Sequence, residues 1–267
     1  MPADLTPPPS RLALTGATGR VARLIRPFLP DAIWLTRNTN PDAMRGADAL
    51  VALAGVTRGD AAALAANTTT ALDALAAARQ LGVPRVFLLS SSAVYGRRPG
   101  PLRAEDAPTP AAPYGQAKSE METAVTRWRD DTPDGPEAIC LRLGNVAGAD
   151  ALLGNLQADR DPTLHIWPDG RSPRRSYIGP RTLARVLATL AALPAPLPPI
   201  LNIGTPDMVE MEDLLRAAGR AFDPVPAPPE AIAQVALDCA PLARLVAMGP
   251  TDTDPTAMVA QWQEARA

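Results

Sequence analysis

Residues 15–22 have the sequence TGATGRVA, and the segments around this stretch decide the fold. A short apolar run at residues 11–15 precedes it, and residues 20–28 place apolar side chains at helical spacing, so we predict a strand, a tight turn and a helix. Gly16 would let the chain turn sharply, and Gly19 would let the backbone approach a pyrophosphate bound by helix-terminal N–H groups. The spacing G-x-x-G-x-x-A is one glycine short of the usual dinucleotide fingerprint, so an ordinary strand–helix turn stays an alternative.

Strands and helices alternate along the chain as far as residue 148. Short apolar runs predict strands at residues 32–36, 49–54, 86–90 and 138–143. Longer periodic segments predict helices at residues 61–81 and 113–128. This alternation predicts an α/β fold, a Rossmann-like doubly wound parallel sheet with right-handed crossovers.

The segment after residue 148 is less regular, until a helix predicted at 182–193 and a strand at 200–203 return to the sheet. We therefore expect a dinucleotide-binding domain formed by residues 1–148 and 176–204. Residues 149–175 and 205–267 would form a small C-terminal substrate lobe over the carboxyl ends of the strands, where ligands bind in open α/β sheets.

Composition narrows the class of ligand. The 267 residues carry a formal net charge of -2, so we expect a small-molecule substrate and no binding to nucleic acid or an acidic membrane surface. The N-terminal segment MPADLTPPPS lacks a secretory pattern, and no run is apolar enough to span a membrane, which favours a cytoplasmic protein. Cys140, Cys239 and His165 are too few for a disulfide framework or a metal site, and we expect Cys140 to be a small buried side chain.

The end of the second predicted strand bears on the choice of cofactor. Dinucleotide folds usually carry an acid there for the ribose hydroxyl, whereas this chain has Thr36, Arg37 and Asn38. An acid would repel a phosphate, but Arg37 could pair with a 2'-phosphate and stack on the adenosine. The sequence thus favours NADP over NAD, with a solvated arginine as the alternative.

Tyr114 and Lys118 are four residues apart in PYGQAK and would share one face of a helix, and Ser91 precedes them in VFLLSSSAVYG. A tyrosine with an ordinary pKa of ~10 is a poor acid or base at neutral pH. A lysine ammonium and a positively charged nicotinamide would stabilise the phenolate, and lowering the pKa by ~3 units needs about 4 kcal/mol. Ser91 would hold the substrate oxygen while Tyr114 transfers its proton.

In this order the motifs resemble the extended short-chain dehydrogenase/reductase family, the group of NAD-dependent epimerases and dehydratases, over nearly the whole chain. The resemblance implies three catalytic residues, Ser91, Tyr114 and Lys118. With Arg37 added from the charge argument, the expected cofactor-binding residues are Gly16, Ala17, Thr18, Gly19, Arg20, Val21, Arg37, Leu53, Ala54, Gly55, Tyr114, Lys118 and Val146. The expected substrate-binding residues are Ser91, Ser92, Asn145 and Arg175, the last being the arginine before a Tyr-Ile pair that in the family contacts a nucleotide-sugar phosphate.

The sequence departs from the family at three places. Only about eleven residues separate Arg37 from the next strand, so a helix, an edge strand and an adenine-contacting aspartate are expected to be missing. The loop between Asn145 and Arg175 is short, which leaves less protein to hold a large nucleotide-sugar. Ser92 and Ala93 replace the Asp-Glu pair of the family's dehydratases, which disfavours dehydration because elimination needs an acid and a base besides the tyrosine.

Three functions follow as alternatives. The first is an NAD(P)-dependent oxidoreductase or epimerase that transfers a hydride at a sugar or sugar-nucleotide hydroxyl, with Tyr114 as acid and base. The second is an NADP-dependent reductase or dehydrogenase of a small carbonyl compound, and the third is a non-catalytic dinucleotide-binding regulator. The resemblance also implies a homodimer through residues 61–81 and 113–128, although core burial explains the small side chains there equally well.

Overall fold

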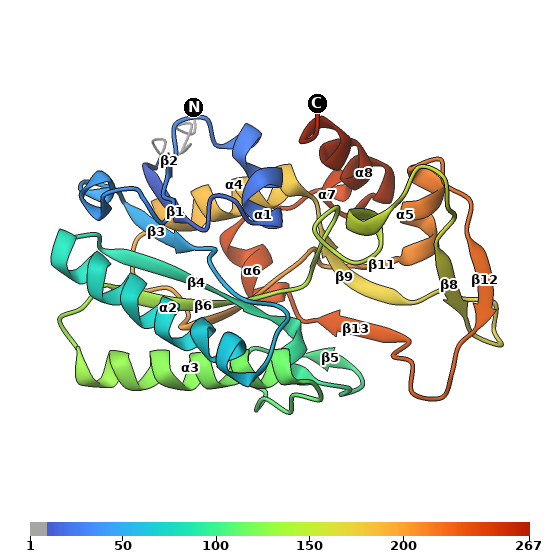
Figure 1. The fold of residues 1–267 in the computed structure, drawn as a ribbon, viewed down its shortest axis with the longest axis horizontal. Helices are drawn as coiled ribbons and strands as arrows, with labels where there is room; N and C mark the ends of the chain where they lie inside the picture. Colours follow the sequence, from blue (N-terminus) through green and yellow to red (C-terminus); the bar gives the residue numbers. More distant parts are fainter. Residues whose placement is uncertain (1–9) are drawn as a thin grey trace.

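The computed structural model describes residues 10–267. Of the N-terminal segment at residues 1–10, expected to lack a secretory pattern, all but Ser10 therefore lies outside the described residues. The central sheet has six parallel strands in the order β10-β6-β4-β3-β1-β2 (Figure 1). They are β1 (Leu12–Thr15), β2 (Ile33–Trp34), β3 (Ala49–Ala52), β4 (Arg85–Ser91), β6 (Glu137–Leu143) and β10 (Ile200–Ile203). The predicted α/β, Rossmann-like parallel sheet is confirmed.

Helices cover both faces of this sheet, as Figure 1 shows. One face packs against α1 (Arg20–Ile25), its 3-10 extension η1 (Arg26–Phe28) and α4 (Pro180–Ala192), and the other against α2 (Ala61–Leu81) and α3 (Pro113–Asp131). Successive residues of a strand point to opposite faces. Leu12 and Leu14 of β1 therefore belong to the first core cluster, whereas Ala13 belongs to the second. Burial on both faces explains why the central strands are continuous apolar runs.

The edge of the sheet next to β2 is shortened. Between β2 and β3 the chain forms only the 3-10 helix η2 (Pro41–Met44), so β2 is the last strand of the sheet. The expected absence of an intervening helix and edge strand is therefore confirmed. The strand predicted at residues 32–36 is shorter in the structure, because only Ile33 and Trp34 pair with β1.

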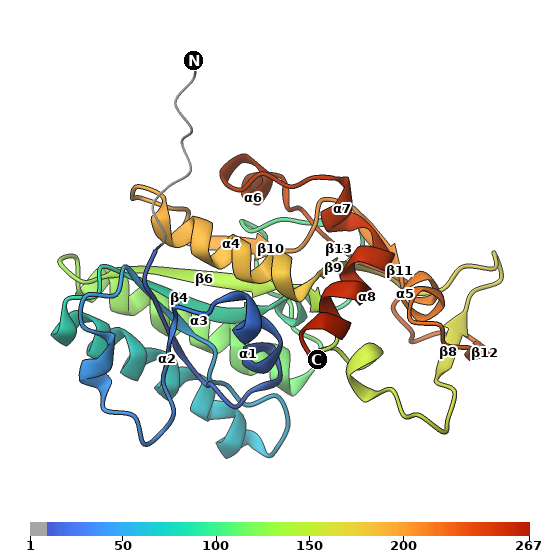
Figure 2. The same cartoon turned by 90° about the horizontal axis from the view of Figure 1, so that it is seen from above.

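A second group of elements lies beyond the carboxyl ends of β4 and β6. A small sheet has the order β11-β9-β13-β5, with β7 beside β9, and β8 pairs with β12 at the far end of the molecule (Figures 1 and 2). The strands of this second group are β5 (Pro101–Leu102), β7 (Asn145–Val146), β8 (Thr163–Ile166), β9 (Arg174–Ile178), β11 (Met208–Glu210), β12 (Asp223–Pro226) and β13 (Gln234–Leu237). The shorter helices are η3 (Ser92–Tyr95), η4 (Leu153–Asn155), α5 (Met211–Ala217), α6 (Ala240–Leu245), α7 (Pro250–Thr253) and α8 (Pro255–Glu264).

Several connections cross the expected boundary between the dinucleotide-binding domain and the substrate lobe, among them the two that follow. Leu242 and Val246, at and just after α6, belong to the core cluster of the central sheet, and α6 contacts β10. In the other direction, β5 from the N-terminal part pairs with β13. The division into two lobes stays a proposal, in which segments of each lobe pack on or pair with the other. Within residues 10–267, no helix combines the length and apolar character that crossing a membrane requires.

Candidate active site

A cavity of about 360 Å³ opens where the central strands end. It brings together eight residues that the sequence predicts for the site: Val21, Leu53, Gly55, Ser91, Tyr114, Lys118, Asn145 and Val146. Parallel strands meet at their carboxyl ends, which is why segments far apart in sequence converge here. The other predicted residues, Gly16, Ala17, Thr18, Gly19, Arg20, Arg37, Ala54, Ser92 and Arg175, do not line this cavity.

The predicted catalytic residues come from β4 and the first turns of α3. Pro113 at the first position of α3 suits a helix start because its missing N–H would have no helical partner. One turn later, Lys118 Nζ donates a hydrogen bond of 2.7 Å to the Leu89 carbonyl oxygen. The Ser91 side chain lies close enough to the Tyr114 phenol to lower its pKa. The predicted Ser91, Tyr114 and Lys118 are thus neighbours in space.

The electrostatics of this group differ from the expectation that Lys118 acidifies the phenol. Burial raises the pKa of Tyr114 above its usual value of 10.0, and only the Ser91 side chain opposes this rise. Burial also lowers the pKa of Lys118 to about 8, so near neutral pH its ammonium holds the proton weakly. The positive nicotinamide of a bound cofactor would have to supply the remaining stabilisation of the phenolate. Lys118 is the only lysine in the chain.

The glycine-rich turn packs closely on the segment after β3. Gly16 has φ +69, and a Cβ built there would lie 2.6 Å from the backbone nitrogen of Ala54. Glycine alone therefore allows the turn after β1 to pack on the segment after β3. The hydroxyl oxygen of Thr15, which precedes the turn, is buried without a hydrogen-bond partner among the described residues. Backbone N–H groups at such a turn are suited to hold a pyrophosphate.

Asn67 fixes the neighbouring loop. Its Nδ2 donates to the carbonyl oxygens of Val56 at 2.9 Å and Leu64 at 2.8 Å, and its Oδ1 accepts from the Val56 N–H at 3.2 Å. A Cβ added at Gly55 would lie 2.9 Å from Asn67 Oδ1 and 3.3 Å from Lys118 Nζ. Asn67 thus ties the loop after β3 to α2, and glycine at position 55 avoids a clash with Asn67 and Lys118.

Arg37 lies in the turn after β2 and is exposed. No ion pair of Arg37 occurs among residues 10–267, and the only acid of the following 3-10 helix, Asp42, pairs with Arg45 at 3.0 Å. The guanidinium of Arg37 is thus available to an anionic group beside the shortened edge of the sheet.

The substrate side of the cavity contains a carboxyl group that sequence reasoning missed. Asp150 lines the cavity next to Asn145, and burial raises its pKa. Its Oδ2 accepts hydrogen bonds from the Tyr177 hydroxyl at 2.6 Å and the Leu152 N–H at 3.3 Å, and its Oδ1 accepts one from the Leu153 N–H at 3.2 Å. An aspartate two residues after a glycine gave no sequence signal, because its burial depends on Tyr177 from β9.

Arg175, expected to contact a substrate phosphate, is engaged elsewhere. Its Nη2 donates to the Ile232 carbonyl at 2.7 Å, and its Nη1 donates to the carbonyls of Arg174 at 2.8 Å and Ala233 at 3.0 Å. These bonds fix the segment before β13 and direct the guanidinium to the backbone. Ser92 begins η3 beside the cavity and does not line it.

Other reactive side chains lie away from this chemistry. Cys140 and Cys239 are both buried, and burial raises the pKa of each thiol to about 12, so neither is a ready nucleophile. Residues 10–267 contain no cluster of three or more His, Cys, Asp or Glu side chains placed to hold a metal ion.

Comparisons with known proteins agree with this arrangement. The sequence model of the NAD dependent epimerase/dehydratase family matches residues 14–204. The UDP-glucose 4-epimerase of Lacticaseibacillus casei is 34% identical over 103 residues, which are 38% of this chain and 30% of that protein. The UDP-glucose 4-epimerase of Azospirillum brasilense is 41% identical over 87 residues, which are 32% of this chain and 24% of that protein. The chain thus matches less than a third of the length of these two curated relatives.

Solved structures share the fold over almost the whole chain. The UDP-glucuronic acid 4-epimerase of Bacillus cereus in complex with NAD has a TM-score of 0.76 at 17% identity, covering 96% of this chain and 98% of that one. The NAD dependent NDP-hexosamine 5,6-dehydratase TunA has a TM-score of 0.73 at 18% identity, covering 97% and 99%. Both proteins are described with NAD, and the second is a dehydratase. The expectations that NADP is preferred and that dehydration is disfavoured therefore gain no support from these relatives.

The family match spans most of the chain, and its motifs surround one cavity at the carboxyl ends of a parallel sheet. The chain therefore belongs to the NAD dependent epimerase/dehydratase family.

Proposed function

We propose that the protein catalyses reversible hydride transfer between a nicotinamide dinucleotide and a hydroxyl-bearing carbon of a sugar or sugar-nucleotide. The observation that carries this proposal is the contact of Ser91 with Tyr114 one helical turn from buried Lys118, in a cavity that also includes Asn145. The names of the curated relatives, both UDP-glucose 4-epimerases, support a UDP-sugar as the first substrate to try.

In the oxidation direction, the substrate hydroxyl would lie between Ser91 and Tyr114, where both side-chain oxygens can bond to it. Tyr114 as phenolate would take the hydroxyl proton, and Lys118 would stabilise the phenolate as an ammonium. The bound cofactor supplies the hydride acceptor and its positive charge. If the keto sugar turns in the cavity, the reduced nicotinamide would return the hydride to the other face of the carbonyl carbon and Tyr114 would return the proton to its oxygen. The net reaction would then be epimerisation without net cofactor reduction.

One observation favours the alternative of a smaller carbonyl substrate. The Arg175 guanidinium is bonded to three backbone carbonyls, so the expected phosphate contact would require it to leave them. A reductase or dehydrogenase of a small carbonyl compound needs no such contact. A non-catalytic regulator would have no use for a buried lysine beside a tyrosine, so we rank it last.

Elimination of water is a further possibility within this family. Ser92 and Ala93 supply no carboxyl group, which was the reason to disfavour dehydration. Asp150, however, is a carboxyl group in the same cavity. Both its oxygens already accept hydrogen bonds from Tyr177 or the backbone, and for that reason we still favour redox chemistry or epimerisation.

For the cofactor we propose that NADP is accepted as well as NAD, and preferred. The exposed Arg37 and the lack of an acid in the turn after β2 support this preference, because an acid there would repel a 2'-phosphate. A cytoplasmic location and a homodimer through α2 and α3 stay predictions.

The experiment is to incubate the protein with NAD or NADP and a panel of UDP-hexoses, UDP-hexuronic acids and small alcohols. Formation of reduced nicotinamide is followed by absorbance, and sugar configuration is followed by NMR. Conversion of a UDP-sugar to its epimer without net cofactor reduction supports an epimerase, whereas turnover of small alcohols alone supports the alternative. Failure of every compound with either cofactor would contradict both.

A further inference from the structure

Three consecutive residues at the end of β4, namely Leu89, Ser90 and Ser91, each interact with a side chain of α3. Leu89 and Ser91 hold the two catalytic side chains of the helix, as described above. Ser90, between them, donates a hydrogen bond of 2.5 Å from its hydroxyl to Oε1 of Glu122. The contact of Ser90 with Glu122 therefore lies between the two contacts that hold Lys118 and Tyr114, and the proposed reaction does not use it.

Glu122 is held from its other side by an ion pair. Arg142 on β6 donates from Nε to Glu122 Oε1 at 3.0 Å and from Nη2 to Oε2 at 2.8 Å, in the two-pronged geometry that guanidinium and carboxylate favour. Glu122 is 5% exposed and Arg142 is 2% exposed. Charges this deeply buried are tolerated only with such partners, and removing one partner leaves the other charge uncompensated.

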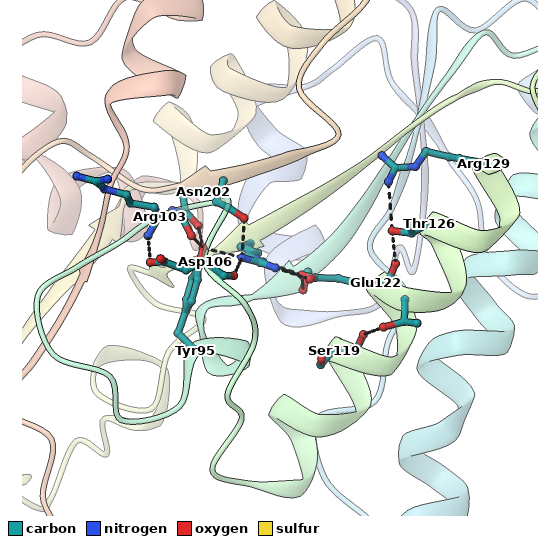
Figure 3. Close-up of polar contacts among 12 residues, drawn as sticks. Tyr95, Arg103, Asp106, Ser119, Glu122, Thr126, Arg129 and Asn202 are labelled. Carbon is teal, nitrogen blue, oxygen red and sulfur yellow. Dashed lines mark hydrogen bonds and ion pairs between the residues drawn. The ribbon is translucent and has the colours of Figure 1, made fainter.

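The same arginine anchors the pair to the rest of the fold, and Figure 3 shows Tyr95, Asn202 and Glu122 of this polar network. Its Nη1 donates to the Tyr95 hydroxyl at 2.9 Å and to the Ala104 carbonyl at 3.0 Å. The Tyr95 hydroxyl donates to Oδ1 of Asn202 on β10 at 2.7 Å, and Nδ2 of Asn202 donates to the Leu102 carbonyl oxygen at 2.8 Å. Glu122 is thus bound to a polar network that spans β4, β6, β10 and the loop before α3, so a shift of α3 along β4 would break several buried bonds.

Glu122 also acts on Lys118 through its charge. The two residues are one turn apart on α3, and the Glu122 carboxylate opposes the burial that lowers the pKa of Lys118 to about 8. The other ionisable group acting on the lysine is Cys140 of β6, whose thiol stays neutral at neutral pH because burial raises its pKa to about 12. Tyr114 shares the cavity, and β4 presents only the Leu89 carbonyl.

We propose that Glu122 is a positioning residue of the active site. Clamped between Ser90 and Arg142, it fixes the placement of α3 on β4 and with it the position of Lys118 against the Leu89 carbonyl. The inference rests on the proposed roles of Tyr114 and Lys118, and it adds a residue that touches neither substrate nor cofactor.

The test compares Glu122→Gln with a matched control, Glu137→Gln. Glu137 also pairs with an arginine across β4 and β6, because Arg85 Nε lies 2.7 Å from its Oε2, but this pair is at the opposite end of the two strands. Each variant loses one carboxylate charge at unchanged size. Since Lys118 is the only lysine, a chain labelled at lysine Cε gives one NMR signal whose shift with pH reports the Lys118 pKa directly.

We expect Glu122→Gln to lower the Lys118 titration midpoint by about one pH unit and turnover by roughly 10-fold or more, with the KM for cofactor nearly unchanged. Glu137→Gln should leave the midpoint and turnover at wild-type values even if it lowers Tm. An unchanged Lys118 midpoint in Glu122→Gln, with turnover equal to that of the control, would overturn the proposal.

If Glu122→Gln does not fold, Ser90→Ala decides, because it removes only the hydroxyl link and leaves the ion pair. A turnover loss of roughly 3-fold or more at constant cofactor KM would support the clamp, and unchanged turnover would overturn it. The NMR titration needs no substrate. A protein that turns over nothing but shows the Lys118 shift would contradict the proposed function while leaving the charge effect of Glu122 established.

Discussion

Lys118 Nζ lies 2.7 Å from the Leu89 carbonyl oxygen, and among residues 10–267 its only other hydrogen-bond contact is with the Met121 sulfur at 3.9 Å. A buried ammonium needs about three acceptors, so this group is poorly compensated. Burial lowers its pKa to about 8. The fold therefore keeps a destabilising charge beside Tyr114, which is expected where a side chain serves catalysis and not stability.

We predict that Lys118→Met stabilises the protein near neutral pH and abolishes turnover. The pKa of Lys118 falls from 10.5 to about 8 on folding, a difference equivalent to roughly 3 kcal/mol when both states are protonated. Below about pH 8 the folded state bears this full cost, and the cost shrinks as pH rises toward 10.5 because the folded chain loses its proton first.

The measurement is Tm by circular dichroism for wild type and Lys118→Met at about pH 7 and about pH 10. We expect Tm to rise by several degrees at the lower pH and the gain to diminish strongly at the higher pH. An equal gain at both values would mean that packing of methionine, and not removal of the charge, explains it.

Gly16→Ala tests the close approach of the cofactor turn to the segment after β3. Gly82, just past α2, is a matched control, since its φ of +72 resembles the +69 of Gly16 but a Cβ there would meet nothing within 4 Å. Gly82→Ala should cost about 1 kcal/mol of unfolding free energy from backbone strain alone. Gly16→Ala should lower the free energy of unfolding, measured by urea denaturation, clearly more than Gly82→Ala does. It should also abolish cofactor binding measured by calorimetry. Equal losses of unfolding free energy in the two variants would refute the close packing at Gly16.

Ser91→Ala should raise the pKa of Tyr114 further, because the Ser91 side chain is what opposes the effect of burial. The chain has three tyrosines, so NMR of chains labelled at tyrosine Cζ can follow each phenol, with Tyr114→Phe identifying the signal. Adding oxidised cofactor to the wild type should lower the pKa of Tyr114, since a positive ring nearby favours phenolate. A phenol insensitive to both changes would remove Tyr114 from the chemistry.

Arg37→Ala should weaken NADP binding by about 10- to 100-fold and leave NAD binding unchanged, because a charge-assisted hydrogen bond is worth about 1.5–3 kcal/mol. Paired calorimetric titrations of wild type and variant measure this. Tighter binding of NAD than of NADP by the wild type, with no effect of the substitution on either, would show that Arg37 is a solvated side chain.

The parts of the fold that local patterns encode were predictable from the sequence. Apolar runs and the turn at Gly16 predicted the parallel sheet, and the short spacing after Arg37 predicted its missing edge strand. The meeting of Ser91, Tyr114 and Asn145 in one cavity follows from the carboxyl ends of parallel strands lying together.

Contacts between distant segments were not predictable. Arg175 is bonded to carbonyls more than fifty residues later in the chain, so its motif alone suggested a free guanidinium. The burial of Asp150 depends on Tyr177, and the pair of Glu122 with Arg142 forms only when α3 packs on β6. The raised pKa of Tyr114 likewise depends on how deeply the helix is buried, which the spacing of Tyr114 and Lys118 does not encode.

The most direct test of the account is Tyr114→Phe, which removes the proton-carrying oxygen and keeps the ring. Turnover is measured with the substrate found in the panel, and cofactor affinity is measured by calorimetry. The account predicts that turnover falls by roughly 100-fold or more while the cofactor Kd stays within a few-fold of wild type. Unchanged turnover in Tyr114→Phe would contradict the assignment of Tyr114 as the acid and base of this site.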